Sequence, residues 1–194
     1  TGTVALNTTG SSGNATVVDA SGLDLGASTV GGNLAATATT GNMTDSGNLT
    51  IAGTSSFTTS ATDATITLNN ANAFTGAVAL NTTGSSGNAT VVDASGLNLA
   101  ASTVGGNLIA TATTGNMEDS GVLTIAGTSS FTTSATDATI TLNNANAFTG
   151  AVALNTTGSS GNATVVDASG LDLGASTVGG NLVATATTGN MTDS

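Results

Sequence analysis

The chain has 194 residues, among them 11 acidic residues and no Lys, Arg or His, which gives a formal net charge of −11 at pH 7. This charge repels phosphates, so we expect no nucleic-acid partner. Cys and Tyr are also absent, so carboxylates are the only side chains that could serve as general acids or bases, and we expect no enzyme activity. No apolar run approaches the roughly 18 residues of a membrane span, so no such span is predicted.

The residues that remain favour β-structure. The chain contains 41 Thr and 21 Ser, and Thr, Val and Ile are β-branched residues that fit a pleated surface. Apolar residues make up 38% of the chain and the mean hydropathy is +0.27, which is enough to bury a core of small side chains. Helix-capping patterns and apolar residues at helical spacing are absent. The sequence therefore predicts an all-β protein.

Internal repeats decide the predicted architecture. The sequence VALNTTGSSGNATVVDASGL begins at Val4, Val78 and Val152, so the period in residue number is 74 (78 − 4 and 152 − 78). The repeats are therefore 1–74, 75–148 and a partial third, 149–194. A strict period of this kind indicates a solenoid. Three independent sandwiches are less favoured, since no linker separates the repeats, so we expect one continuous segment over 1–194.

Alternation of apolar and polar residues predicts the strands. Inward-facing residues are expected, in chain order, at Val4, Leu6, Leu23, Leu25, Leu34, Met43 and Leu49, and then along the alternating stretch 64–83, ATITLNNANAFTGAVALNTT. The first two repeats differ at six positions, all in the outward phase: Thr3/Ala77, Asp24/Asn98, Gly26/Ala100, Ala35/Ile109, Thr44/Glu118 and Asn48/Val122. Ile109 and Val183 would then be exposed apolar residues, unless a local bulge turns them inward.

The number of coils in each repeat follows from the spacing of large apolar residues. The steps in residue number between Phe74, Leu97, Leu123 and Phe148 are 23, 26 and 25. This spacing predicts about three coils, each of about 25 residues, in one repeat. Four coils of roughly 18 residues remain an alternative. Each strand would pair with the strand one coil away, at about 4.8 Å along the axis. The fold class is therefore a parallel β-helix, or β-solenoid.

The acidic residues are the candidate metal ligands. Asp19 and Asp45 differ by 26 in residue number, as do Asp93 and Asp119, so each pair is expected at adjacent levels of one corner, with Glu118 adding a carboxylate in the middle repeat. Because no base can pair with them, these groups are hydrated, protonated or bridged by a cation. Ca²⁺ takes such oxygen ligands. A weak Ca²⁺ site and solvated corners are the two interpretations, and no other cofactor is expected.

Three closely spaced asparagines, Asn69, Asn70 and Asn72, recur as Asn143, Asn144 and Asn146. Side-chain amides can form hydrogen bonds along a β-stack. Asn also tolerates the left-handed backbone conformation at a corner. We therefore expect a structural role for these residues.

The chain also resembles a known class of proteins. The stretch GNLTIAGTSSFTTSATDATITLNNANAFTGAVALNTTGSSGN, residues 47–88, is similar to the tandem β-strand repeats of very large bacterial exoproteins. Those proteins are of the filamentous-haemagglutinin type of adhesin or are autotransporter passenger domains. The resemblance implies a right-handed parallel β-helix, export from the cell, and a role as a stalk, adhesin or matrix fibre. It implies no catalytic residues.

The expected function is the structural shaft of an extracellular fibre or cell-surface adhesin. A solenoid is lengthened by repeating a coil, which suits a function spread along a length. We expect self-association, end to end or laterally, and contact with a host cell surface or matrix. One alternative is a binding module that presents a Thr-rich face, such as Thr37 and Thr39, to ice or a glycan. The other is a polysaccharide-cleaving β-helix that uses Asp19 and Asp93.

Overall fold

The computed structural model describes residues 2–194, and this part of the chain contains strands and turns but no helix, hence none that could cross a membrane. The strands are β1 (Thr3–Val4), β2 (Ala15–Asp19), β3 (Leu23–Leu25), β4 (Ser28–Val30), β5 (Leu34–Ala38), β6 (Met43–Asp45), β7 (Leu49–Ile51), β8 (Ser55–Thr62), β9 (Ile66–Phe74), β10 (Val78–Thr83), β11 (Ala89–Asp93), β12 (Leu97–Leu99), β13 (Ser102–Val104), β14 (Leu108–Ala112), β15 (Met117–Asp119), β16 (Leu123–Ile125), β17 (Ser129–Thr136), β18 (Ile140–Phe148), β19 (Val152–Thr157), β20 (Ala163–Asp167), β21 (Leu171–Leu173), β22 (Leu182–Ala186) and β23 (Met191–Asp193).

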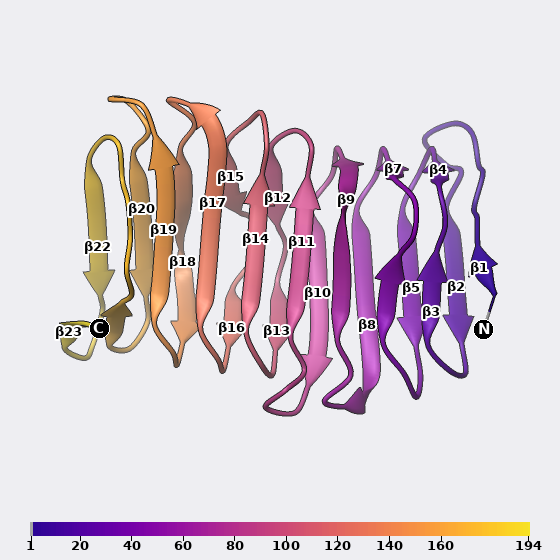
Figure 1. The fold of residues 1–194 in the computed structure, drawn as a ribbon, viewed down its shortest axis with the longest axis horizontal. Coiled ribbons are helices and arrows are strands. Elements are labelled where there is room, and N and C mark those ends of the chain that lie inside the picture. Colours follow the sequence, from indigo (N-terminus) through magenta and orange to yellow (C-terminus); the bar gives the residue numbers. More distant parts are fainter. Residues whose placement is uncertain (1) are drawn as a thin grey trace.

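These strands form a parallel β-solenoid. A 12-stranded sheet follows the order β1-β3-β6-β9-β11-β14-β17-β19-β21-β23, with β4 and β7 beside it, and an 11-stranded sheet runs from β2 through β5, β8 and β10 towards β22. The paired strands are parallel, as in β2 with β5 and β5 with β8. Nine successive pairings therefore separate β1 from β23, and Figure 1 shows the coils stacked along the longest axis. The expected fold class is confirmed.

The coils are shorter than the spacing of the large apolar residues predicted, and they vary in length. Ala15 pairs with Leu34, Leu34 with Ser55 and Ser55 with Val78, so the residue number advances by 19, 21 and 23 over successive coils. The longer coil contains a bulge in β8, where the register shifts before β10 is paired again. The spacing of large apolar residues overestimated the coil because Phe74 ends one strand whereas Leu97 begins another.

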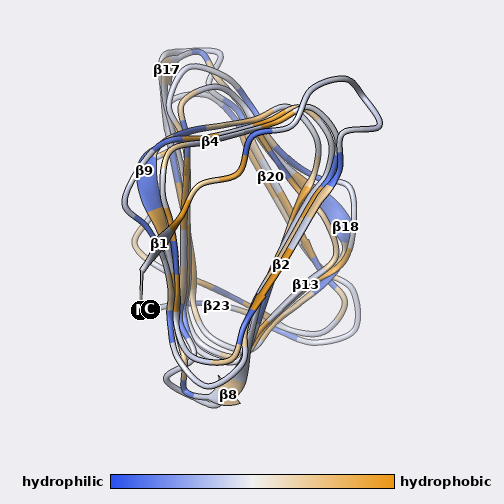
Figure 2. Cartoon of the chain, turned by 90° about the vertical axis from the view of Figure 1, so that its right-hand side faces the viewer, coloured by the Kyte–Doolittle hydropathy of each residue, from blue (hydrophilic) through white to orange (hydrophobic). Residues whose placement is uncertain are grey.

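Each full repeat makes about three and a half coils. Three pairings lead from β2 to β10, and β11, whose sequence copies β2, follows half a coil later in the other sheet. The third copy, β20, returns to the sheet that contains β2. Figure 2 shows the result along the axis, where the identical strands β8 and β17 lie at opposite ends of the coil and β9 and β18 lie on opposite sides. Successive repeats are therefore related by half a turn.

The interior is filled by the residues that the alternation placed inward. Leu23, Leu25, Leu34, Met43 and Leu49 are all at most 2% exposed. The four phenylalanines form two edge-to-face pairs: the ring centroids of Phe57 and Phe74 are 5.8 Å apart, and those of Phe131 and Phe148 are 5.9 Å apart. The same core is thus built twice, on opposite sides of the solenoid.

The positions that differ between the first two repeats lie on the outside, with one exception. Gly26 is buried, because the side-chain methyl group of Thr3 covers it. Ile109 and Val183 are 50% and 55% exposed, so they are outward-facing apolar residues and no bulge turns them inward. Close packing of the interior explains why volume changes are confined to the surface.

Closely stacked glycines form one corner of the solenoid, and a side chain added there should destabilise the fold. A Cβ atom on Gly105 would lie 2.5 Å from the carbonyl oxygen of Gly84 in the preceding coil, so Gly105→Ala must push two coils apart. We expect this variant to lower the free energy of unfolding by about 1–3 kcal/mol. Denaturant unfolding followed by circular dichroism measures it.

The matched control for this substitution is Gly174→Ala. A Cβ atom there meets nothing closer than 3.4 Å, and the middle repeat already has Ala100 at the corresponding position. The control should retain the stability of the unaltered chain. Equal unfolding midpoints for the two variants would contradict the close contact between coils.

Candidate functional site

The acidic residues do not lie in the pairs that their spacing predicted. Asp19 ends β2 in the 11-stranded sheet, whereas Asp45 ends β6 in the 12-stranded sheet. Asp93 and Asp119 are divided between the sheets in the same way. Their spacing of 26 in residue number exceeds the advance of 19 to 23 over one coil, so the second carboxylate of each pair lies on the other side of the solenoid.

The structure instead builds a buried polar column from three successive coils. Asn72 donates a hydrogen bond from Nδ2 to Oδ2 of Asp45 over 2.7 Å, and on the next coil its Cα partner is Asp93. Asn72 and Asp93 are 0% exposed, and Asp45 is 7% exposed. The next repeat forms the same column, by half a turn on the opposite side, from Asp119, Asn146 and Asp167.

The carboxylate of Asp45 holds the bulge in β9. Its Oδ1 accepts a hydrogen bond from the backbone N–H of Asn69 over 3.0 Å, and its Oδ2 accepts one from Asn70 over 3.2 Å. The two extra residues of this bulge lie between Leu68 and Asn72. Asn69 thus acts through its backbone, whereas Asn70 also donates a hydrogen bond from Nδ2 to the backbone carbonyl of Asp45 over 2.8 Å, in keeping with the structural role that the sequence predicted.

Both oxygens of the Asp93 carboxylate also accept hydrogen bonds from within the protein. Its Oδ2 accepts a hydrogen bond from the backbone N–H of Phe74 over 3.2 Å, and its Oδ1 accepts from the N–H and hydroxyl of Ser95. Buried carboxylates with several donors are satisfied without a cation. Among residues 2–194, no three acidic side chains gather into a group that could hold a metal ion. Ca²⁺ binding at Asp19, Asp45, Asp93 and Asp119 stays a prediction.

Asp19 and Asp93 occupy the same position in successive repeats but differ in burial. The N–H and hydroxyl of Ser21 donate to Asp19 and lower its pKa below the ordinary value of 3.8. Burial beneath Asn72 raises the pKa of Asp93, although Ser95 and Phe74 donate hydrogen bonds to it. The coil that covers Asp93 therefore turns a lowered carboxyl pKa, as in Asp19, into a raised one.

This difference predicts opposite pH effects on stability. Asp93 binds its proton more tightly when folded, so the stability from protonation is present below 3.8 and is lost as the pH rises through the folded pKa. For Asp19, the stability is present above 3.8 and is lost as the pH falls through the folded pKa. Carboxyl ¹³C chemical shifts measured against pH should place Asp93 above Asp19; the reverse order would contradict the burial argument.

A second amide column was missed by the sequence analysis. Asn14 Oδ1 accepts a hydrogen bond from the backbone N–H of Asn33 over 2.7 Å, and Asn33 Oδ1 accepts one from Thr54 over 2.9 Å. Asn88, Asn107 and Thr128 repeat this arrangement. These asparagines, and not Asn69 and Asn70, form the amide ladder along the solenoid axis. The signal in the sequence was the recurrence of Asn at a separation of 19, which equals one short coil.

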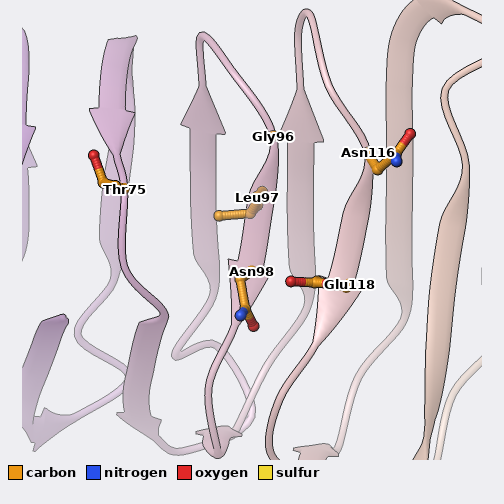
Figure 3. A pocket seen from close by; sticks show the side chains of 6 residues that line it. All are labelled: Thr75, Gly96, Leu97, Asn98, Asn116 and Glu118. Carbon is orange, nitrogen blue, oxygen red and sulfur yellow. The ribbon is translucent and has the colours of Figure 1, made fainter. Parts of the chain in front are cut away.

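A shallow surface hollow in the middle repeat is the other polar site. It has a volume of about 300 Å³ and is lined by Thr75, Gly96, Leu97, Asn98, Asn116 and Glu118. Asn98 and Glu118 are directly paired on the neighbouring strands β12 and β15. Figure 3 shows the Glu118 side chain extending towards the strand that carries Asn98. This hollow contains one carboxylate and side-chain oxygens but no base.

Comparison with known families gives one result. Residues 12–81, 86–155 and 160–194 match the family described as "Repeats of unknown function (DUF5649)". The chain belongs to this family. The starts of the three DUF5649 matches, at positions 12, 86 and 160, have the same period as the repeat found in the sequence. No curated protein and no solved structure matches the chain.

The DUF5649 repeat is therefore, in this chain, a unit of three and a half solenoid coils. The family match and the fold confirm the tandem β-repeat that the sequence predicted. The narrower likeness to haemagglutinin-type adhesins and autotransporters stays a prediction.

Proposed function

We propose that this chain is the non-catalytic shaft of an extracellular fibre or cell-surface adhesin, of the kind its resemblance to bacterial exoproteins implies. The observation that carries the proposal is the continuous series of nine parallel pairings, in which each inner coil is held by the coils before and after it. Stability in such a protein accumulates along one axis. A rod of this type becomes longer when further copies of the same repeat are added, because each new coil pairs with the coil before it.

The half-turn between repeats also favours a shaft. Each surface feature of the repeat occurs on opposite sides of successive repeats, as β9 and β18 do in Figure 2. A recognition surface for one flat ligand needs its groups on one side. A shaft, in contrast, gains from features that are balanced about its axis.

Self-association end to end is part of this proposal. In the last coil, Leu182 is 42% exposed and Met191 46% exposed, whereas their counterparts Leu108 and Met117 are at most 1% exposed beneath the following coil. An added coil would bury these residues and would pair the edge strands β22 and β23. In the isolated chain, a second copy placed end to end would supply such a coil. Sedimentation velocity of the isolated chain and of Met191→Asp tests this contact, and identical sedimentation would contradict it.

The function itself is tested on intact cells of the source organism. The full-length protein, carrying an epitope in an exposed turn such as 10–13, should be labelled by antibody without lysis. Insertion of one further full repeat should lengthen the rod by about 17 Å in electron micrographs, at three and a half coils of about 4.8 Å. Labelling that requires lysis would overturn the extracellular proposal, and an unchanged length would overturn the shaft.

One observation favours a second candidate, the Thr-face binding module. A ladder of polar side chains follows one side over five coils: Thr37, Thr58, Asn81, Thr103 and Thr124. Such a row could order water or contact sugar hydroxyls. Thermal hysteresis, or retention on a glycan array that is lost in Thr58→Val, would support it over the shaft.

A further inference from the structure

Four of the six differences between the first and second repeats lie together in one surface patch. Thr3 pairs with Asp24 and Asp24 with Thr44 on successive coils, and Gly26 lies beneath Thr3. The corresponding residues of the middle repeat are Ala77, Asn98, Glu118 and Ala100. The middle repeat has therefore changed one coherent patch and has kept almost everything else.

In the first repeat, hydroxyl groups of this patch and its neighbours donate hydrogen bonds to both oxygens of the Asp24 carboxylate. Thr3 Oγ1 donates a hydrogen bond to Oδ2 of Asp24 over 2.6 Å, and Ser46 Oγ donates to the same oxygen over 2.8 Å. Thr44 Oγ1 donates to Oδ1 over 3.3 Å. A Cβ atom on Gly26 would lie only 2.6 Å from the Thr3 methyl group, so the threonine needs a glycine there. The donors together lower the pKa of Asp24 below its ordinary value.

In the middle repeat two of the three donors are gone, and Ser120, the counterpart of Ser46, donates no hydrogen bond to Asn98 Oδ1. Ala77 has no hydroxyl, and Glu118 replaces the threonine that donated from the next coil. Oδ1 of Asn98 is consequently a buried acceptor that receives no hydrogen bond from any of residues 2–194. The net charge of the patch is unchanged, because the carboxylate has moved by one coil from the position of Asp24 to that of Glu118. The hollow of about 300 Å³ lies at these two residues.

We propose that this hollow binds a divalent cation of the Ca²⁺ type, with the Glu118 carboxylate and Asn98 Oδ1 as its protein ligands. Water or a cation can satisfy Asn98 Oδ1 and the Glu118 carboxylate, but only a cation also balances the carboxylate charge, because the chain has no Lys, Arg or His. Ca²⁺ accepts carboxylate, amide and hydroxyl oxygens and water together. The hollow has room for the waters, and the hydroxyl of Thr75 lines it. The site occurs in the middle repeat alone among the described residues.

The test is Ca²⁺ binding by the whole chain, measured by calorimetry. The unaltered chain should bind one Ca²⁺ with a Kd in the range of about 10⁻⁴–10⁻³ M that extracellular modules show. Glu118→Thr, which restores the residue of the first repeat, should remove this binding. So should the double variant Ala77→Thr, Ala100→Gly, which restores the donating threonine while leaving Glu118 in place. Both variants use residues that already occupy the same positions in the first repeat, so the fold should be retained.

A second measurement does not depend on any variant. In the unaltered chain, millimolar Ca²⁺ should shift the side-chain amide resonances of Asn98, and those of Asn107, whose Oδ1 accepts from Thr128, should stay unchanged. Unchanged Asn98 resonances, or equal binding by Glu118→Thr and the unaltered chain, would overturn the proposal. So would a shift caused by a neutral monosaccharide and not by Ca²⁺.

Discussion

Leu80→Asp should unfold the coils around β10. Leu80 is 0% exposed and its Cα partner in the preceding coil is Phe57, which is also 0% exposed. Loss of a buried leucine costs about 2–5 kcal/mol, through lost burial and the cavity left behind. The new carboxylate adds the cost of an ionised group that no base in the chain can pair with. Thermal denaturation followed by circular dichroism should show a lower midpoint.

Native-state hydrogen exchange then locates the damage in this variant. Each coil of a solenoid contacts only its neighbours, so protection should be lost first in β8, β10 and β12. The control is Ala79→Asp, one residue earlier and partly exposed on the outer face, which should change the free energy of unfolding much less than Leu80→Asp, by about 0.5 kcal/mol. Equal losses in the two variants would refute the inward assignment of Leu80.

The alternation that assigns Leu80 inward shows what the sequence can predict. Inward residues such as Leu25, Leu34 and Met43 were identified from period two alone, because the pleat places every second side chain in the core. The coil length was harder. It depends on bulges in β8 and β9, and the bulge in β9 is stabilised by a carboxylate from the preceding coil. The half-turn between successive repeats follows from the same coil lengths, so the sequence did not predict it either.

The candidate sites divide in the same way. Asp45 and Asn72 meet across a bulge at a separation of 27 in the chain, and no fixed coil length predicts that contact. The patch around Asn98 and Glu118 was visible as two of six differences in a near-perfect repeat. That these two positions are neighbours becomes clear only once the length of their coil is known from the pairing of β12 with β15. Repetition therefore reveals where the chain differs, and the fold shows which differences meet.

Asp119→Ala should lower the stability of the solenoid substantially. Asp119 accepts hydrogen bonds from the N–H of Asn143 over 3.0 Å and from Nδ2 of the buried Asn146 over 2.7 Å. Alanine leaves both donors without an acceptor. At about 1–3 kcal/mol for the unsatisfied donor of the buried Asn146, and less for the N–H of the exposed Asn143, we expect a loss of about 1–4 kcal/mol in the free energy of unfolding. Urea denaturation measures this loss, and hydrogen exchange should show the bulge in β18 opening first.

The control for this variant is Asp172→Ala. Asp172 accepts one hydrogen bond, from the exposed hydroxyl of Thr192 over 3.1 Å, so its loss should cost no more than about 0.5 kcal/mol. A third variant, Asp119→Asn, keeps the shape and one acceptor oxygen but turns an amide N–H₂ towards a donor, so its stability should fall between the other two. If Asp119→Ala were as stable as Asp172→Ala, the buried column would not hold the bulge, and the uneven coil lengths would need another cause.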